Sequence, residues 1–342
     1  MNSILHQDIS DFASNCDFSN LLANSRFLIT GATGLLGSTL IHCLLALNND
    51  VEIVAPVRNI NKSKAIFDES ELNRIKIVEC DLQTFNYSKL GSFDYIVHCA
   101  SPTSSKYFVD YPVETFSTIV LGTKRLLDYA AHNSSKAFIY LSSLEVYGEI
   151  SSDSNYITEN DQGFLDITGI RSSYPMAKRS AENLCCLYAK EYGVPARIMR
   201  LTQTTGAGIA NDDNRIIAQF ARLVANNQDI VLHTNGKSAR PYCYTIDAIS
   251  ALLYIMLRGT DGQAYNVAND ETYISAYDMA VYLKDNFNKS ISVRTEVNNY
   301  MGYAPTTLQR LSSRKVMALG WRPRYGLKEI FERLILYFNS TR

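Results

Sequence analysis

RFLITGATGLLGSTLIHCLLAL, residues 26–47, is the stretch of sequence that decides the fold of this chain. Its apolar start predicts a short strand, and the periodic apolar residues after the glycines predict a helix. Between them, Gly31 would allow a sharp turn, Gly34 a close approach of the backbone to a diphosphate, and Gly37 tight packing of the helix on the strand. The helix would also direct unpaired N–H groups and its positive end at the phosphates. We therefore predict a dinucleotide-binding turn, with a tight turn in another kind of α/β protein as the alternative.

The composition is that of an ordinary soluble globular enzyme, with 342 residues of which 46% are hydrophobic and 20% charged. The net charge of −1 argues against nucleic-acid binding and against a polybasic membrane patch. No apolar run is long enough to span a membrane, and the N-terminal residues lack the basic and apolar regions of a signal peptide. We expect a cytoplasmic protein that binds neither nucleic acid nor a membrane.

The seven cysteines are odd in number and form no CxxC pair, so neither a disulfide framework nor a thiolate zinc site is indicated. The five histidines show no metal-ligand spacing. We predict reduced cysteines and no metal site.

Strand-like and helix-like segments alternate along the first two thirds of the chain. The predicted strands are residues 27–29, 51–57, 75–78, 95–98, 137–141 and 196–201, and the predicted long helices are residues 115–131 and 174–192. This alternation predicts a Rossmann-type, doubly wound parallel α/β sheet covered by helices on both faces. Beyond about residue 205 the elements are shorter, which indicates a smaller C-terminal lobe. The predicted divisions, with parts interleaved, are a leader (1–21), a dinucleotide-binding domain with the catalytic residues (22–205) and the smaller lobe (206–342).

The end of the second predicted strand is expected to select the cofactor. A carboxylate there would bind the adenosine ribose and favour NAD, but none occurs between Arg58 and Asp68. An arginine can instead donate two hydrogen bonds to a 2′-phosphate, and Lys62 and Lys64 are close in sequence. We predict NADP(H), and NAD(H) is the alternative if Arg58 is solvated or stacks on adenine.

Further cofactor contacts are expected after the next strands, because ligands of such sheets lie at the carboxyl ends of the strands. Asp81 could accept a hydrogen bond from the adenine amino group, although a turn or helix-capping role fits it nearly as well. Small residues after the fourth strand would leave room for the cofactor, whereas His98 is interpreted as a core residue. The predicted contacts of the cofactor are Gly31, Thr33, Gly34, Leu35, Leu36, Gly37, Arg58, Asp81, Leu82 and Ala100.

Three residues that could act on one substrate oxygen follow each other along the chain. Tyr174 and Lys178 are four residues apart and share one face of a helix, which Pro175 places near its start. A lysine next to a phenol lowers the phenol pKa, so Tyr174 could give or take a proton near neutral pH. Ser143, at the end of the fifth strand, could bind the same oxygen. An exposed aromatic–lysine pair alone is common, but this order after the glycine turn favours a catalytic site.

The chain resembles the extended short-chain dehydrogenase/reductase family of nucleotide-sugar enzymes in the segments GATGLLG (31–37), SSLEVYG (142–148) and YPMAK (174–178). The resemblance extends from Phe27 to the C-terminus. It implies that Ser143, Tyr174 and Lys178 are the catalytic residues. Tyr174 would be the acid/base at the sugar oxygen, and Lys178 would also hold the nicotinamide ribose. Both residues are therefore also predicted contacts of the cofactor.

The same resemblance implies contacts with a nucleotide-sugar substrate. Arg240 matches an arginine that contacts the nucleotide diphosphate, and Gln203 stands where many relatives have an asparagine on the nucleotide. The acidic residue of the Arg240 segment, Asp247, would order the following helix, and Trp321 in the closing LGWRP motif is expected to pack. The predicted substrate-binding residues are Ser143, Glu145, Arg171, Gln203 and Arg240.

Two departures from the family pattern guide the choice of reaction. Related 4,6-dehydratases carry an Asp-Glu pair where this chain has Leu144 and Glu145, and leucine cannot donate a proton. UDP-glucuronate decarboxylases carry Ser-Glu there, so Leu144 weakens a decarboxylase interpretation too. Glu145, Arg171 and Arg240 nevertheless fit a decarboxylase. Because Arg58 favours exchangeable NADPH, we predict a 4-ketoreductase acting on a substrate of the dTDP-4-keto-6-deoxyglucose type for bacterial surface polysaccharide (O-antigen, lipopolysaccharide). The alternatives are a redox-neutral 4-epimerase or UDP-glucuronate decarboxylase with tightly bound NAD, and a non-catalytic NADP-binding sensor.

Relatives in this family are often homodimers that pair through a four-helix interface. The helices concerned would be residues 115–131 and 174–192, and their apolar faces are compatible with such pairing. A homodimer is therefore an expectation from the resemblance.

Overall fold

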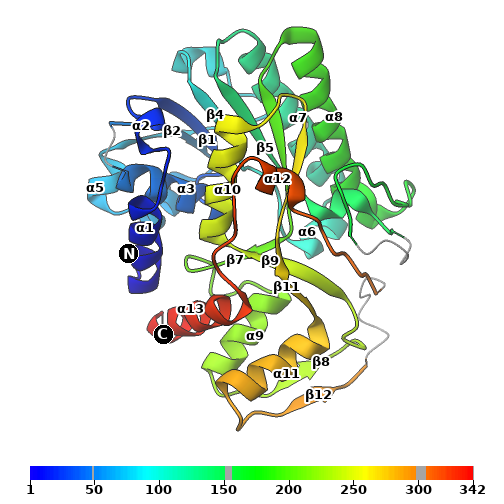
Figure 1. Ribbon diagram of the computed structural model, residues 1–342. Helices are drawn as coiled ribbons and strands as arrows, with labels where there is room; N and C mark the ends of the chain where they lie inside the picture. The colour runs from blue at the N-terminus through cyan, green and yellow to red at the C-terminus, as the bar shows by residue number, and fades with distance from the viewer. Residues whose placement is uncertain (48–49, 151–155, 298–305, 342) are drawn as a thin grey trace.

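The computed structural model describes residues 1–47, 50–150, 156–297 and 306–341. Its larger part is built on a seven-stranded parallel sheet with the strand order β10-β6-β5-β4-β1-β2-β3 (Figure 1). The strands are β1 (Arg26–Thr30), β2 (Glu52–Val57), β3 (Ile75–Glu79), β4 (Tyr95–His98), β5 (Ala137–Ser143), β6 (Ala196–Leu201) and β10 (Ala264–Val267). The strand order changes direction between β1 and β4, and the carboxyl edge at that point is where such sheets bind ligands.

Helices cover both faces of the sheet because its strands are apolar on both faces. In β1, Leu28 packs into one buried core, whereas Phe27 and Ile29 pack into the other. The long helices on the first face are α7 (Pro112–Ala131) and α8 (Ser173–Tyr192), and those on the second are α3 (Leu35–Ala46) and α10 (Thr245–Arg258). This arrangement confirms the predicted Rossmann-type doubly wound sheet.

The element boundaries differ from the predicted ones by a few residues, and one strand of the sheet was not predicted. Helix α8 begins at Ser173, so Pro175 lies in its first turn, where a missing N–H costs no hydrogen bond. The extra strand, β10, comes from the C-terminal part of the chain and pairs with β6. Shorter helices of this domain are α4 (Ile60–Ile66), α5 (Glu69–Leu72), η1 (Tyr87–Leu90), α6 (Ser105–Asp110), η2 (Leu144–Tyr147) and η3 (Ile170–Ser172).

A smaller lobe lies below the carboxyl edge of the sheet in Figure 1. Its elements are α9 (Ile216–Ala225), β8 (Ile230–Leu232), α11 (Ala276–Phe287), β12 (Val293–Thr295) and α13 (Leu327–Ser340). A three-stranded sheet joins the two parts, with the strands β7 (Gln203–Thr205), β9 (Ala239–Tyr244) and β11 (Asn269–Ser275). Helix α12 (Arg314–Ala318) packs near β10.

The residues predicted as a leader contain a helix, α1 (Ser3–Ser14), followed by the single turn α2 (Ser19–Leu22). Helix α1 packs against α3 and lies beside α13 (Figure 1). Asp8 of α1 is buried and accepts hydrogen bonds from the Tyr244 hydroxyl and the Arg333 guanidinium. Burial raises the pKa of Asp8 to about 6. The helix therefore ties the larger domain to the smaller lobe.

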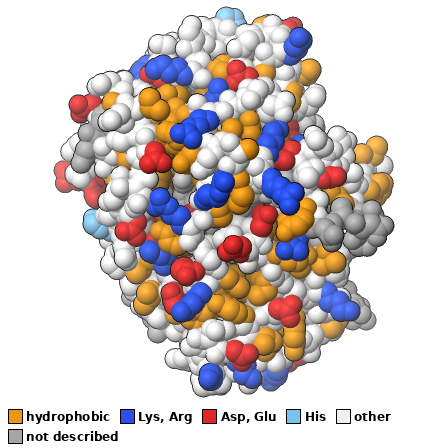
Figure 2. All heavy atoms as spheres, viewed as in Figure 1, with side chains coloured by type: hydrophobic (Ala, Val, Ile, Leu, Met, Phe, Trp, Pro, Cys, Tyr) orange, Lys and Arg blue, Asp and Glu red, His pale blue; other side chains and the backbone are white. Residues whose placement is uncertain are grey.

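Charged side chains of both signs are interspersed over the face shown in Figure 2. In the described ranges of the chain, no helix is long and apolar enough to cross a membrane. Within the same residues, no group of three His, Cys, Asp or Glu side chains is placed to hold a metal ion.

Candidate active site

The glycine turn joins β1 to α3 and is shaped by the backbone at the end of β4. Gly31 has a φ of +69°, and a Cβ atom there would lie 2.6 Å from the backbone nitrogen of Ala100. A Cβ atom at Gly37 would collide with the carbonyl oxygen of Gly31. Gly34 differs, because it is exposed and a Cβ atom there would meet only the Gly31 oxygen, at 3.4 Å. The first and third glycines are thus required by the turn itself, and the second is not.

The exposed side of the turn fits a cofactor diphosphate. Gly34 is the N-cap of α3 and offers no side chain to the first N–H groups of that helix. These N–H groups and the positive end of the helix dipole suit an anion. Thr33, Leu35 and Leu36 are half-buried around the same turn. All predicted contacts of the turn lie together, and their binding of a cofactor remains a prediction.

A buried chain of hydrogen bonds supports the end of β4 beside this turn. His98 Nε2 lies 3.2 Å from the Thr123 hydroxyl, and His98 Nδ1 lies 2.7 Å from the Thr30 hydroxyl. The Thr30 hydroxyl also accepts a hydrogen bond from the N–H of Ala100 at 3.3 Å. Because Thr123 donates to the Ile119 carbonyl oxygen, His98 donates from Nε2 and accepts at Nδ1. Burial lowers the pKa of His98 to about 3. His98 is therefore a neutral core residue.

Arg58, the predicted cofactor selector, follows β2 and is exposed. The structure brings a carboxylate to this point that the local sequence did not reveal. Glu79, at the end of β3, pairs with Val57 and accepts a hydrogen bond from the N–H of Ile60 at 3.2 Å. The Glu79 carboxylate is hydrogen-bonded to the backbone at the start of α4, so one of its oxygens already has a partner within the protein. The preference for NADP remains a prediction that rests on Arg58.

Asp81 and Leu82 come shortly after β3. The exposed Asp81 carboxylate accepts from the N–H of Gln83 at 2.8 Å, which is the turn role considered as its alternative. Leu82 packs against the core on the α7 side, and its carbonyl oxygen accepts from the Tyr87 hydroxyl at 3.2 Å. Contact of either residue with a cofactor remains a prediction.

Lys178 lies under the ends of β4 and β5. Its side chain is 3% exposed, and its ammonium group donates to the Leu141 carbonyl oxygen at 2.7 Å. The same nitrogen is 5.8 Å from the centre of the Tyr174 ring. Burial lowers the pKa of Lys178 to about 8. Tyr174 and Lys178 therefore come together on α8, as their spacing predicts.

The protonation of Tyr174 differs from the prediction. Burial raises the pKa of its phenol, and the Glu145 carboxylate raises it further, whereas a hydrogen bond with the Ser143 side chain lowers it. The prediction that Lys178 lowers the pKa of Tyr174 is wrong for this structure. The reason is that desolvation outweighs the nearby charge, and the ammonium group is held at Leu141. Tyr174 is thus a protonated phenol, which is a proton donor.

Glu145 and Arg171, predicted separately as substrate contacts, form an ion pair. One guanidinium nitrogen of Arg171 lies 2.9 Å and 3.1 Å from the two carboxylate oxygens of Glu145. The Ser143 hydroxyl caps η2 by accepting from the N–H of Glu145 at 3.2 Å. Leu144 is buried in a separate apolar cluster with Leu311, where it serves packing.

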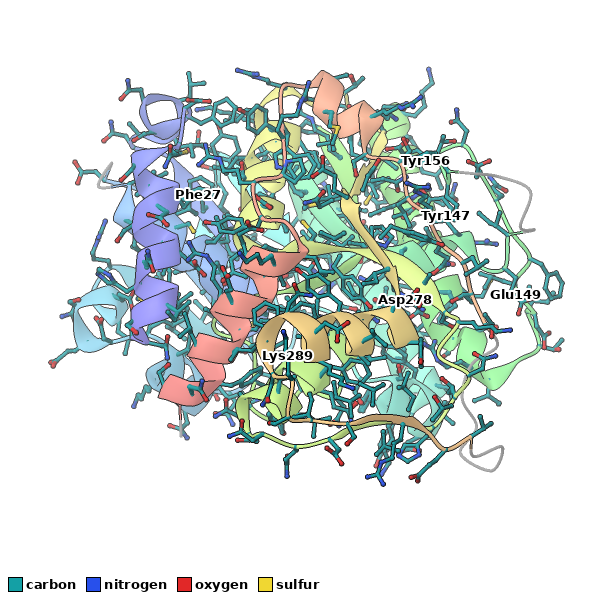
Figure 3. All side chains as sticks on the ribbon, turned by 60° about the horizontal axis from the view of Figure 1, so that its bottom comes forward. Phe27, Tyr147, Glu149, Tyr156, Asp278 and Lys289 are labelled. Atoms are coloured by element: carbon teal, nitrogen blue, oxygen red, sulfur yellow. The ribbon has the colours of Figure 1, made fainter. Side chains whose placement is uncertain are left out.

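Tyr147 anchors η2 behind this pair. Its hydroxyl donates to Asn266 Oδ1 at 2.6 Å and accepts from Arg200 at 3.0 Å. Arg200 in turn pairs with Glu182 of α8 at 2.7 Å. Figure 3 shows Tyr147 and Tyr156 at the same end of the molecule. The segment that carries Glu145 is therefore fixed to β6, β10 and α8.

Gln203 and Arg240 lie on the neighbouring strands β7 and β9. Gln203 is in register with Tyr242, so Gln203 and Arg240 belong to one face of this small sheet. The Gln203 Oε1 atom is buried and has no hydrogen-bond partner within the described residues. Arg240 donates to the Thr307 hydroxyl at 3.1 Å.

Asp247 holds the C-terminal segment to the first turn of α10. Its carboxylate accepts from the N–H groups of Arg324 and Tyr325, each at 3.0 Å, and burial raises its pKa to about 7. The Trp321 indole is fully buried and donates to the Asp247 carbonyl oxygen at 3.1 Å. Trp321 therefore packs, as the sequence indicates.

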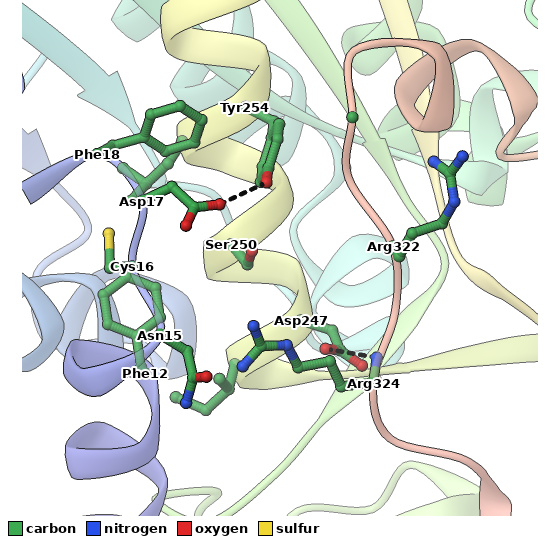
Figure 4. Close-up of a pocket in the computed structure, with 13 residues that line it drawn as sticks. Phe12, Asn15, Cys16, Asp17, Phe18, Asp247, Ser250, Tyr254, Arg322 and Arg324 are labelled. Atoms are coloured by element: carbon green, nitrogen blue, oxygen red, sulfur yellow. Dashed lines mark hydrogen bonds between the residues drawn. The ribbon is translucent and has the colours of Figure 1, made fainter.

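A pocket of about 240 Å³ opens beside Asp247, between α10, residues 12–18 and residues 320–324 (Figure 4). Helix α10 covers the opposite face of the main sheet from α8. The pocket is therefore separate from the Tyr174 site.

Phe108 is a residue of the site that the sequence analysis missed. Its ring stacks on the Tyr174 ring, with the ring centres 4.1 Å apart. It comes from α6, in the connection after β4, and no motif or spacing relates it to Tyr174.

Comparison with known proteins assigns the chain to a family. Residues 27–268 match the model of the NAD dependent epimerase/dehydratase family. The chain belongs to this family. It is an enzyme of this nucleotide-sugar epimerase/dehydratase family, and the resemblance to extended short-chain dehydrogenases/reductases is confirmed.

Its relatives within the epimerase/dehydratase family include UDP-glucuronic acid decarboxylase 3 of Arabidopsis thaliana. That protein is 27% identical over 306 residues, which cover 90% of this chain and 86% of the relative. A similar solved structure is UDP-glucuronic acid 4-epimerase from Bacillus cereus in complex with UDP-glucuronic acid and NAD, with a TM-score of 0.79, 21% identity and coverage of 93% and 100%. RMD from Pseudomonas aeruginosa complexed with NADPH has a TM-score of 0.72, 20% identity and coverage of 93% and 100%. These two structures share the fold.

Proposed function

We propose that this chain acts on C4 of a nucleotide-activated sugar in a redox-neutral reaction, either decarboxylation of UDP-glucuronate or 4-epimerisation of a UDP-sugar. The observation that carries the proposal is the meeting of Tyr174, Ser143 and the Glu145 carboxylate at the carboxyl end of β5. The curated relatives named for UDP-glucuronic acid support this substrate class. They favour this reaction over the 4-ketoreductase predicted from the sequence, which becomes the second candidate.

The chain's own residues account for the proton that moves at the C4 oxygen in such a reaction. A bound nicotinamide supplies the acceptor and the donor of the hydride at C4. Tyr174 exchanges a proton with the sugar oxygen at C4, and the Ser143 hydroxyl holds that oxygen by a hydrogen bond. Lys178, with a pKa of about 8, stays mostly protonated at neutral pH and keeps a positive charge 5.8 Å from the phenol ring.

The proposed binding groups lie on both sides of the reacting carbon. The N–H groups at the start of α3 hold the cofactor diphosphate. Arg240 and Gln203 hold the substrate nucleotide, because a guanidinium can donate two parallel hydrogen bonds to a diphosphate. The Glu145–Arg171 pair binds the sugar, with Arg171 available to a sugar carboxylate.

The second candidate is net reduction of a 4-keto-6-deoxy sugar nucleotide, of the dTDP-4-keto-6-deoxyglucose type, by NADPH. Arg58 is exposed after β2, where a 2′-phosphate would lie, and Leu144 is buried where dehydratases carry an acid. The Tyr174 phenol is protonated, as proton donation to a C4 carbonyl oxygen requires.

A homodimer is also proposed, through α7 and α8. Its support is a set of exposed apolar side chains on these two helices, namely Phe116, Leu121 and Leu187. Light scattering of the purified protein measures the mass directly, and a monomer at micromolar concentration would contradict the proposal.

The two candidates are distinguished by the nucleotide that the protein retains and by the sugar that it turns over. The purified protein is denatured, the released nicotinamide nucleotide is identified, and fresh protein is assayed with UDP-glucuronate and with dTDP-4-keto-6-deoxyglucose plus NADPH. Retained NAD with turnover of UDP-glucuronate supports the first candidate, and stoichiometric consumption of NADPH supports the second. Tyr174→Phe is the control, since full turnover by this variant would reject both. Any turnover excludes a non-catalytic NADP sensor.

A further inference from the structure

Phe108 lies directly against the predicted catalytic tyrosine, although no motif includes it. It belongs to the short helix α6, where its side chain is 2% exposed while that of the next residue, Val109, is 49% exposed. The Phe108 and Tyr174 rings are parallel, with centres 4.1 Å apart and planes 9° apart. One face of the phenol is therefore covered by an aromatic ring.

The segment from η3 to the start of α8 contacts Phe108 at two further points. The Ser173 hydroxyl donates to the Phe108 carbonyl oxygen at 3.0 Å. The Arg171 guanidinium lies over the Phe108 ring, 4.9 Å from its centre, and pairs with Glu145 at the same time. Phe108 is thus connected to the tyrosine, to the ion pair and to the Ser173 side chain between them.

The stack limits how the phenol can turn. The χ2 torsion of tyrosine is broad, so the plane of the ring is set by what covers its faces. A stacked aromatic pair contributes about 0.5–1.5 kcal/mol beyond the burial of area. With one face covered by Phe108, water is kept from that face, while the hydroxyl keeps its hydrogen bond with Ser143.

We propose that Phe108 is a positioning residue for Tyr174, which fixes the plane of the phenol and closes one of its faces, so that the substrate oxygen is met from the Ser143 side. The inference rests on the proposed function only for the proton transfer assigned to Tyr174. An aliphatic side chain at position 108 would fill space without fixing the plane.

Three variants separate positioning from packing. Phe108→Leu removes the ring, Phe108→Tyr keeps it, and Val109→Ala is the control on the same helix. The first measurement needs no substrate: ¹³C NMR of protein labelled at the hydroxyl-bearing ring carbon of tyrosine, with the Tyr174 signal identified by its loss in Tyr174→Phe. Burial raises the pKa of this phenol, so the Tyr174 signal is expected to remain that of the neutral phenol up to the highest pH at which the protein is folded. Phe108→Leu is expected to begin titrating at a lower pH, as water reaches the phenolate. Phe108→Tyr and Val109→Ala leave the titration unchanged.

The second measurement is steady-state kinetics with the nucleotide sugar that the protein accepts. Phe108→Leu is expected to lower kcat by about tenfold to a hundredfold through misplacement of Tyr174, with KM changed by about twofold or less. Phe108→Tyr retains the unmodified kcat. The unfolding temperature of each variant is measured in parallel.

The proposal is overturned if Phe108→Leu titrates and turns over like the unmodified protein. It is equally overturned if Phe108→Tyr and Phe108→Leu lose activity alike. Should Phe108→Leu fail to fold, Phe108→Met, which keeps the volume without a ring, takes its place in both measurements. If the NMR shift occurs in a protein that turns over no nucleotide sugar, the proposed function fails and the positioning role stands.

Discussion

The glycine turn and the Tyr174 cluster lie at the same carboxyl edge of the sheet, but different forces build them. Backbone sterics shapes the turn, where a Cβ atom at Gly31 would come within 2.6 Å of the Ala100 nitrogen. The cluster is assembled by side chains from α6, η2, η3 and α8 through a ring stack and an ion pair. We infer that substitution of Gly31 or Gly37, which the turn itself requires, changes folding and cofactor binding together, whereas substitutions in the cluster change the chemistry and leave the fold intact.

The largest effect is expected in the cluster, from Tyr174→Phe. This variant loses the hydroxyl but keeps the ring that stacks on Phe108. Loss of a general acid–base group lowers kcat by about 10²–10⁴-fold. Chemical denaturation and the nucleotide content of the purified variant should match those of the unmodified protein. A variant that unfolded readily as well would break the distinction between the two regions.

The next largest effect is expected in the turn, from a matched pair of glycine substitutions. Gly31→Ala forces an L side chain into a φ of +69° and against Ala100, which costs about 1–3 kcal/mol for the backbone alone. Gly34→Ala has a φ of −92° and meets only a 3.4 Å contact, so its stability should change little. Its added methyl group projects where the diphosphate is proposed to lie, and it should bind the dinucleotide more weakly.

Urea denaturation and a nucleotide-binding titration of both glycine variants check this contrast. Equal loss of stability in Gly31→Ala and Gly34→Ala would show that the turn is not shaped as described. Unchanged nucleotide affinity in Gly34→Ala would remove the diphosphate from this position.

The turn was predictable from sequence because its signal is local. The spacing of Gly31, Gly34 and Gly37 and the apolar period that follows them lie within one short segment, so no tertiary contact is needed to read them. The pairing of Tyr174 with Lys178 was predictable for the same reason, since residues four apart share a helix face.

The surroundings of the tyrosine could not be predicted, because they come from distant segments. Phe108 carries no pattern that relates it to Tyr174, and the pairing of Glu145 with Arg171 depends on how η2 meets η3. Whether the pKa of Tyr174 is raised or lowered depends on how deeply the phenol is buried, and a sequence motif does not show this burial. Glu79 reaches the end of β2 only because β2 and β3 are neighbours in the sheet.

The folding stability is expected to depend on pH through His98, which supports the end of β4 beside the glycine turn. The pKa of His98 is lowered to about 3 in the folded protein, against about 6.5 in an unfolded chain, so below about pH 6.5 only the unfolded state takes up this proton. Folding stability from His98 is therefore present above pH 6.5 and is lost as the pH falls, by up to about 1.4 kcal/mol per pH unit.

The measurement is the difference in the free energy of unfolding between the unmodified protein and His98→Gln at several pH values from 7 down to about 4.5. Asp8 and Asp247 also titrate in this range, but they are common to both proteins and cancel in the difference. The advantage of the unmodified protein should shrink as the pH falls. A constant difference would mean that His98 is not held neutral.

The smallest effect is expected from Arg58, which lies outside both regions on the surface. Arg58→Asp should weaken NADPH binding by about tenfold, equivalent to about 1.4 kcal/mol, and favour NADH, because the 2′-phosphate loses a cation and meets a carboxylate. Lys89→Ala, at an exposed lysine of η1 outside the cofactor region, is the control. An unchanged ratio of NADPH to NADH affinity would leave cofactor choice to other residues.

The central claim is that hydrogen moves between C4 of a nucleotide sugar and the nicotinamide while Tyr174 handles the proton. The direct measurement is mass spectrometry of the nicotinamide nucleotide and the sugar, quenched during a single turnover, with deuterium placed at C4 of UDP-glucuronate or on NADPH with the 4-keto sugar. With UDP-glucuronate the account predicts that deuterium appears on reduced nicotinamide before the turnover is complete and is back on the sugar at the end. With deuterated NADPH it predicts that deuterium ends on the sugar, and with Tyr174→Phe neither transfer occurs. Product that forms while the nicotinamide never carries deuterium from the sugar, or never gives it up, would contradict the account.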